Sequence, residues 1–411
     1  MAKNEKNRKL MTLCAFGLVL VTGGCAFGPQ ASVTTTEVVT TEEVTTEEPT
    51  TEEPTPTSAT INGEEYDLDV TSLDLSHCSS DDVDEIIDAI TQMPSLEKVN
   101  LMTSNNTSYF MIEDVQKLID AAPSVKFIYR FILFDRKVSL QDTVIKYHKA
   151  DIGNHGADEL RQALSVLKKC EYFLLDDCGI DNEILAGIRD EFPDTKVVWR
   201  IHVGNQSALT DDTVIRMTHG VDDSMTEPLK YCNETVYMDL GHDEALTDIS
   251  FVSNMPDLEC IILAGSSVND ISPLMDCPNL KWLELNNCLK VNDLSQVSEN
   301  KSIECLNISH TGIRDITPAN DMKLERFCCI GNGISQGQIN AFCAANPDCM
   351  TSFSGNEWGY AWRYDDHGYT YCAYYARMRE VFRYDTTSPG GFKFPEYVEP
   401  ENVTDPDDIV I

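Results

Sequence analysis

The sequence predicts an α/β fold, a solenoid of stacked coils whose short parallel strands form one sheet. The first observation is a phrase of the form L-x-x-L-x-L-x-x-N/C, which recurs five times between residues 234 and 332. The second is an Asp followed by Ile or Leu between successive phrases. One strand and one return loop in each period of about 22 residues is the signature of leucine-rich repeats. The five phrases begin at Thr235, Leu258, Leu280, Ile303 and Leu324.

A third observation extends the solenoid toward the N-terminus with longer repeats. Val83, Ile86 and Ile90 share one face of a predicted helix, and a predicted strand follows it. The segments DTVIKY (142–147) and DTVIRM (212–217) lie 70 residues apart and follow similar helices and strands. We therefore expect long helical repeats over 61–217, built from a duplicated unit of about 70 residues, and short repeats over 218–355. Because one repeat cannot bury its own apolar edge, the coils must stack, here as a horseshoe with a concave parallel sheet.

Both ends of such a solenoid need a cover. Asn62-Gly63 between β-favouring residues predicts a tight hairpin, which would serve as an N-terminal cap. Residues 356–388 are dense in Tyr and Trp, and Tyr374, Tyr375, Met378 and Phe382 have helical spacing. We interpret this segment as a C-terminal cap over the last coil, with an aromatic ligand platform as the alternative.

The chain begins with basic residues, an apolar run and Gly23-Gly24-Cys25, the pattern of a secretory signal. The Gly23-Gly24-Cys25 motif resembles the lipobox of bacterial lipoproteins, and this resemblance implies a signal over 1–25 and lipidation of Cys25. An uncleaved membrane anchor is the alternative. Residues 26–60 are rich in Thr, Glu and Pro, and 389–411 are Pro- and acid-rich, so we expect a disordered stalk and tail. Either anchor places the protein on the extracellular face of the cytoplasmic membrane.

Charge and cysteine positions exclude several classes of function. A formal net charge of −37 argues against a nucleic-acid partner, because phosphate binding requires clustered Lys and Arg. Among fifteen cysteines, Cys78, Cys178 and Cys288 occupy the N/C position of a repeat, so we expect mostly free, buried thiols. No metal-ligand spacing, nucleophile motif or nucleotide-binding loop is present in the sequence. We predict no metal, no cofactor and no enzymatic activity.

Repeat geometry predicts where a partner would bind. In each strand the leucines face the core, and the residues between them project from the concave sheet. Aromatic residues and Arg dominate binding hot spots, and several stand at these positions. Trp282 could alternatively pack on its neighbouring coil. The predicted binding residues are Tyr172, Tyr237, Asp239, Ile262, Trp282, Glu284, Asn307 and Arg326.

Taken together, the signal, acidic stalk, repeats and aromatic end resemble bacterial cell-surface leucine-rich-repeat lipoproteins, with short internalin-like coils after longer helical ones. The resemblance implies a lipid-anchored protein that binds macromolecules and does not catalyse a reaction. The preferred hypothesis is a surface for a protein or peptide, in adhesion or scaffolding. The alternatives are a glycan-binding module and a hydrolase whose site is assembled across repeats.

Overall fold

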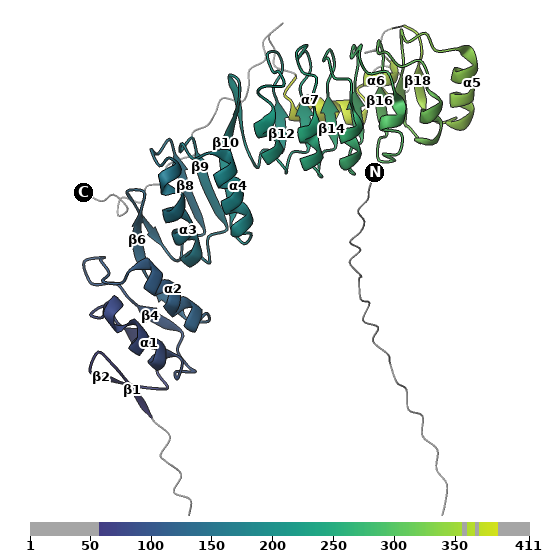
Figure 1. Ribbon diagram of the computed structural model, residues 1–411. Helices are drawn as coiled ribbons and strands as arrows, with labels where there is room; N and C mark the ends of the chain where they lie inside the picture. Colours follow the sequence, from purple (N-terminus) through teal and green to yellow (C-terminus); the bar gives the residue numbers. More distant parts are fainter. Residues whose placement is uncertain (1–56, 356–359, 366–369, 385–411) are drawn as a thin grey trace, which may run out of the picture. The chain divides into compact units, whose positions relative to one another are not determined.

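The computed structural model describes residues 57–355, 360–365 and 370–384 (Figure 1). The expected signal, Cys25, the acidic tail and most of the expected stalk lie outside these residues. In the described part of the chain, no helix is both long and apolar enough to cross a membrane.

The fold begins with the predicted hairpin. Strands β1 (Ser58–Ile61) and β2 (Glu64–Asp67) pair antiparallel, and Asn62 and Gly63 both have positive φ between them. β1 therefore includes the last residues of the range expected as stalk. The first helical coils follow as a parallel sheet of β3 (Ser72–Asp74), β4 (Lys98–Asn100) and β5 (Lys126–Ile128), with helices α1 (Val83–Ile90) and α2 (Ile112–Ala121).

Two antiparallel hairpins interrupt the helical coils at equivalent places. The first joins β6 (Arg130–Leu133) to β7 (Arg136–Ser139), and the second joins β10 (Lys196–Val203) to β11 (Gln206–Leu209). Arg130 pairs with Ser139 and Arg200 with Leu209, so the hairpins have the same 70-residue offset as the DTVI segments. Between them lie β8 (Val144–His148), α3 (Ala157–Val166), β9 (Tyr172–Asp176) and α4 (Asn182–Glu191).

The short repeats form a seven-stranded parallel sheet in which the strands pair in sequence order. Each strand returns to the next through a short 3-10 helix or, in the last coil, through α5 (Gln336–Ala345). The strands are β12 (Val214–Arg216), β13 (Tyr237–Asp239), β14 (Cys260–Ile262), β15 (Trp282–Glu284), β16 (Cys305–Asn307), β17 (Arg326–Cys328) and β18 (Met350–Ser352). The 3-10 helices among the described residues are η1 (Ser80–Asp82), η2 (Asn154–Gly156), η3 (Glu227–Tyr231), η4 (Ser250–Asn254), η5 (Ser272–Asp276), η6 (Leu294–Gln296) and η7 (Thr317–Asp321).

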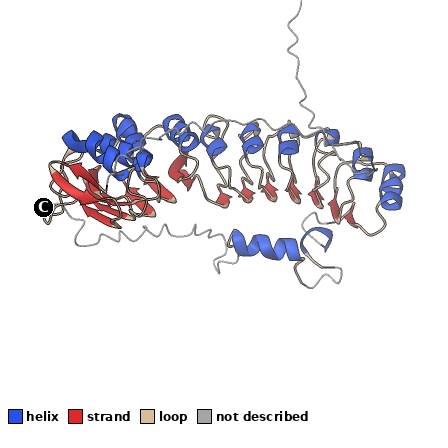
Figure 2. Cartoon of the chain, turned by 90° about the horizontal axis from the view of Figure 1, so that it is seen from below, coloured by secondary structure: helices blue, strands red, loops and turns tan. Residues whose placement is uncertain are grey.

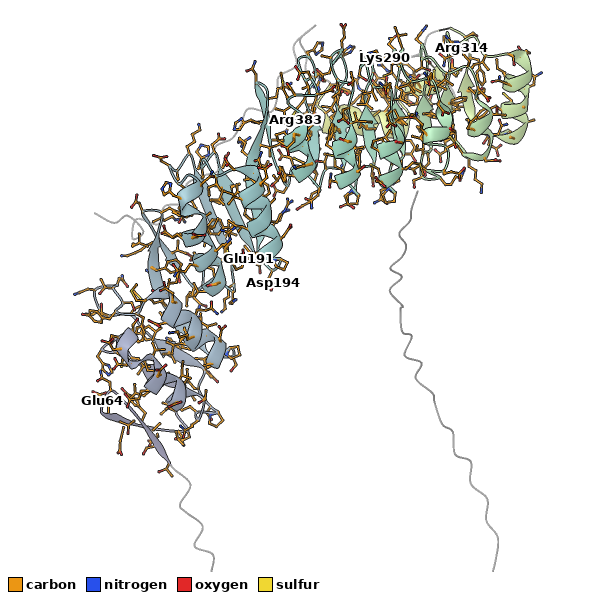
Figure 3. All side chains as sticks on the ribbon, in the orientation of Figure 1. Glu64, Glu191, Asp194, Lys290, Arg314 and Arg383 are labelled. Atoms are coloured by element: carbon orange, nitrogen blue, oxygen red, sulfur yellow. The ribbon has the colours of Figure 1, made fainter. Side chains whose placement is uncertain are left out.

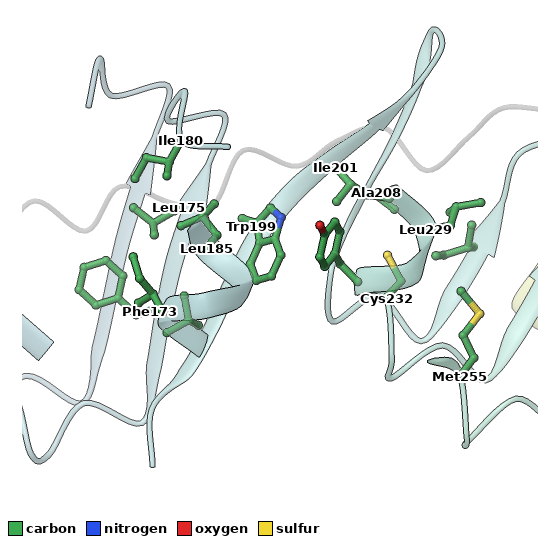
Figure 4. Close-up of a cluster of buried hydrophobic side chains, with 14 of the residues drawn as sticks. Phe173, Leu175, Ile180, Leu185, Trp199, Ile201, Ala208, Leu229, Cys232 and Met255 are labelled. Carbon is green, nitrogen blue, oxygen red and sulfur yellow. The ribbon is translucent and has the colours of Figure 1, made fainter. Parts of the chain in front are cut away.

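One apolar core runs through all the coils, from Ile61 to Phe342. Leu283 and Leu285 face inward with no exposed surface, as the repeat pattern predicts. Where the helical coils meet the short ones, Trp199 lies among buried apolar side chains such as Leu185 and Ile201 (Figure 4). Its ring packs against Tyr231, and its indole N–H donates to Asn182 (2.9 Å). No disulfide joins the thirteen described cysteines, and eleven of them are buried.

The aromatic end of the chain forms α6 (Tyr360–Arg363) and α7 (Ala373–Val381). These helices do not cover the end of the last coil, where we expected a cap. They lie against the strands, on the side opposite the 3-10 helices (Figure 2). We call residues 360–365 and 370–384 the strap.

Candidate functional site

The outward side chains of β12–β17, which we call the sheet face, form two rows across the sheet. Strand register aligns Tyr237, Cys260, Trp282, Cys305 and Arg326 in one row. It aligns Arg216, Asp239, Ile262, Glu284, Asn307 and Cys328 in the other. Seven of the eight predicted binding residues are therefore neighbours. The eighth, Tyr172, belongs to β9 in another sheet, where the Lys146 ammonium lies 5.7 Å from its ring.

The sheet face is not the open surface that the sequence suggested, because the strap covers it. Trp282 is only 1% exposed, and the centroid of its ring system lies 4.0 Å from that of Trp362. Tyr374 and Tyr375 flank the same indole at 6.1 and 6.4 Å. Trp282 thus packs on the strap, neither exposed nor packed only on its neighbouring coil. Asp239, Ile262, Glu284, Asn307 and Arg326 are also buried, and Tyr237 is half-buried.

An apolar row on α7 and the residue that follows it provide most of this cover. Tyr375, Met378 and Phe382 are buried against the sheet face, whereas Arg377 and Glu380 between them are exposed. Large apolar side chains at these spacings form one face of a helix. Arg383, labelled in Figure 3, is exposed just beyond α7.

Polar contacts hold the two ends of the strap. At one end, Arg216 donates to the carbonyl oxygen of Phe382 (3.1 Å), and the Tyr384 hydroxyl donates to Asp239 (2.6 Å). At the other end, Arg326 donates to the carbonyl oxygens of Ala361 and Tyr364 at 3.3 and 2.8 Å. Guanidinium groups of the sheet face therefore recognise the main chain of the strap.

The middle of this interface contains a buried carboxyl group. Burial raises the pKa of Glu284 to about 7, while Arg363 and the indole N–H groups of Trp362 and Trp282 act in the opposite direction. Those two indole N–H groups are buried without a hydrogen bond of good geometry. The strap thus closes over polar groups that it satisfies only in part.

A cleft of about 510 Å³ remains between the strap and the ends of β12–β15. Gly241 and Ala264 line it on the side of the solenoid, and Arg363, Tyr375 and Tyr384 of the strap line it from the other side. At its rim the rings of His219 and His242 stack with centroids 5.1 Å apart. The described lining contains the Thr218 hydroxyl, the carboxyl groups of Asp239 and Glu284, and the imidazoles of His219 and His242.

The residue three positions after each member of the second outward row, which runs from Arg216 to Cys328, has a left-handed backbone. Such φ values favour Gly and are tolerated by Asn and, less often, His. At Gly331 an added Cβ would lie 2.3 Å from the His310 ring, so this position also requires a residue without a side chain. These left-handed residues are His219, His242, Gly265, Asn287, His310 and Gly331.

The sequence predicted most residues of the sheet face, but it did not predict which residues contact them. Arg216 and Tyr384 were not among the predicted site residues, although both close one end of the interface. The helical spacing of the strap was visible in the sequence, but that pattern does not say which surface the helix covers. No group of three or more His, Cys, Asp or Glu residues in the described chain could hold a metal ion.

The sequence matches no family profile and no curated protein. Among solved structures, an internalin (InlF) of Listeria monocytogenes is 16% identical, with 64% of this chain and 75% of that chain covered and a TM-score of 0.33. A leucine-rich-repeat protein of Leptospira interrogans is 13% identical over 64% and 74% of the two chains, with a TM-score of 0.29. The functional domain of InlJ from Listeria monocytogenes is 11% identical over 64% and 60%, with a TM-score of 0.27.

Proposed function

We propose that this chain is a lipid-anchored protein of the bacterial cell surface that binds a protein or peptide through its sheet face. The observation that supports binding is that this face already holds a polypeptide segment, the strap. Trp282 contributes the aromatic centre of the contact, and Arg216 and Arg326 bind main-chain carbonyl groups. Aromatic side chains and Arg are the residue types that dominate protein interfaces.

Main-chain recognition favours a polypeptide over a glycan. The carbonyl oxygens bound by Arg216 and Arg326 belong to peptide groups, which sugars lack. Sugar rings typically stack on an exposed aromatic face, but Trp282 is covered by Trp362, and the guanidinium carbon of Arg363 lies 4.9 Å from the Tyr375 ring centroid. The glycan-binding alternative therefore has less support than the peptide-binding one.

The experiment compares three full-length chains immobilised at equal density. They are the wild type, a strap-released variant (Met378→Asp with Phe382→Asp), and that variant with Trp282→Ala added. Each chain is exposed to surface proteins that were cross-linked to this protein in intact cells. We expect the strap-released chain to retain such a protein and the variant with Trp282→Ala added to lose it. Retention by wall-polysaccharide arrays, with the same loss, would instead support glycan binding. Equal retention by all three chains would contradict a site on the sheet face.

The proposed anchor is tested separately. Cys25→Ser should abolish incorporation of a labelled fatty acid and release the protein from the membrane fraction. Unchanged membrane attachment of the variant would support the uncleaved anchor, and protection of the wild type from external protease would contradict surface display.

A further inference from the structure

We propose that the sheet face is a receptor for an amphipathic helix of another protein, with large apolar side chains at positions i, i+3 and i+7 and arginines beside them. The strap occupies the face as an internal substitute for that helix. This inference rests on the proposed function and names the class of partner.

The strap shows which pattern the face accepts. Tyr375, Met378 and Phe382 follow the i, i+3, i+7 spacing, and all three are buried in one cluster with the sheet face. The Cys260 thiol lies 3.2 Å from the Met378 sulfur, and Phe382 meets Tyr237 edge to face. A helix that docks on the face of a sheet is recognised through the side chains along one side of the helix. Strand addition at a sheet edge instead uses main-chain hydrogen bonds.

Charge indicates the remaining feature of the partner. The chain as a whole is strongly acidic, with 68 Asp and Glu against 31 Lys and Arg. The end of the strap is locally basic, because Arg377, Arg379 and Arg383 outnumber its one carboxylate, Glu380. The Arg377 guanidinium lies 5.7 Å from the Tyr237 ring of the sheet face. The net charge of the chain therefore favours a basic helix, and an Arg at the position of Arg377 keeps the contact with the Tyr237 ring. The sheet face itself carries both signs, Arg216 and Arg326 beside Asp239 and Glu284.

The strap can leave without opening the solenoid. The coil core and the cluster under the strap share no residue: Leu283 and Leu285 belong to the first, and Trp282 belongs to the second. Release would expose an apolar and aromatic surface, and such surfaces mark interaction sites on soluble proteins.

The closed interface is also incompletely satisfied. The indole N–H groups of Trp282 and Trp362 are buried without a hydrogen bond of good geometry, beside the buried carboxyl of Glu284. Both donors approach the same acceptor, the Glu284 carboxyl, and its burial disfavours the charged form, so closing the strap over this group costs free energy at neutral pH. A helix that leaves the Glu284 carboxyl in contact with solvent avoids this cost and can displace the strap.

The experiment titrates peptides against the full-length wild type and the strap-released variant. The probes are the strap peptide 370–384, the same peptide with Tyr375→Ser, Met378→Ser and Phe382→Ser, and a designed helix of equal length. The designed helix keeps only Tyr, Met and Phe at i, i+3 and i+7 and three arginines in an alanine and glutamine background. Fluorescence anisotropy gives the affinities, and amide hydrogen exchange of the wild-type strap reports its displacement.

We expect the strap peptide and the designed helix to bind the strap-released chain at least tenfold more tightly than the wild type. The triple-serine peptide should lose at least tenfold, and excess designed helix should speed exchange in the wild-type strap without speeding it in β15. Equal binding to both chains, equal binding of the serine peptide, or no displacement in the wild type would overturn the proposal. A wild-type dimer that the strap peptide dissociates would show that a second copy is the occupant, which also overturns it. Retention of a non-helical partner in the cross-linking experiment, with no peptide binding here, would refute only the class of partner.

Discussion

Trp282→Ala and Leu283→Ala test whether the two sides of one strand serve different structures. The two residues are neighbours in β15, and both are almost completely buried. Leu283 lies in the coil core, whereas Trp282 lies in the cluster under the strap. Removal of a buried Trp costs about 3–5 kcal/mol, and removal of a buried Leu about 2–5 kcal/mol.

The two substitutions have similar free-energy costs, but they should affect different equilibria, strap closure in one case and unfolding of the coils in the other. Trp282→Ala should weaken strap closure, and since about 1.4 kcal/mol is a factor of ten, closure should weaken by roughly a hundredfold or more. Leu283→Ala should lower the free energy of unfolding of the coils, because the cavity it leaves lies inside the solenoid.

Hydrogen exchange and chemical denaturation distinguish the two outcomes. In Trp282→Ala we expect fast exchange over 370–384, near-native protection in β14–β16 and little change in the main unfolding midpoint. In Leu283→Ala we expect reduced protection throughout the short coils and a lower midpoint. A Trp282→Ala chain that keeps its strap protected, or that unfolds as early as Leu283→Ala, would refute the separation of the two clusters.

Three further predictions concern other parts of the molecule. Strap closure should weaken by on the order of 3 kcal/mol as pH rises from about 4.5 to about 7, because the closed form raises the Glu284 pKa from 4.5 to about 7 and so binds its proton more tightly. Glu284→Gln should remove the pH dependence of the strap's protection factors, which correct the exchange rates for their intrinsic pH dependence, and a variant with the wild-type profile would contradict this. Gly331→Ala should destabilise the fold by about 2 kcal/mol in urea, through its φ of +76° and the clash with His310. Gly337→Ala in α5 should be neutral or stabilising, because the added Cβ would make only an ordinary contact with the Ser335 hydroxyl oxygen at 3.9 Å. Thiol titration without reductant should count at least thirteen cysteines in denaturant but mainly the exposed Cys343 in the native protein; a near-zero count in denaturant would show disulfides.

The repeat pattern predicted the parts of the fold in which local and global requirements agree. The spacing of Leu258, Leu280 and Ile303 predicts inward positions every coil, and all three are buried. The hairpin at Asn62-Gly63 was also predictable, because its turn requires positive φ at both positions. The position of the strap was not predictable, because it depends on contacts such as Tyr384 with Asp239, 145 residues apart. No periodicity within one segment contains that information.

The composition of the sheet face therefore has two explanations that the sequence alone does not separate. Trp, Tyr and Arg at alternate strand positions indicate an interface. The surface that covers them can belong to another protein or to another segment of the same chain. The strap accounts for the burial of Trp282, but it also buries the Glu284 carboxyl, which the indole N–H groups of Trp282 and Trp362 approach without ideal hydrogen-bond geometry. Burial raises the pKa of that carboxyl to about 7, so closing the strap over its charged form costs free energy at neutral pH. Groups buried in this way lower the stability of the closed state without opening the coil core, which is the energetic requirement for a face that exchanges one helix for another.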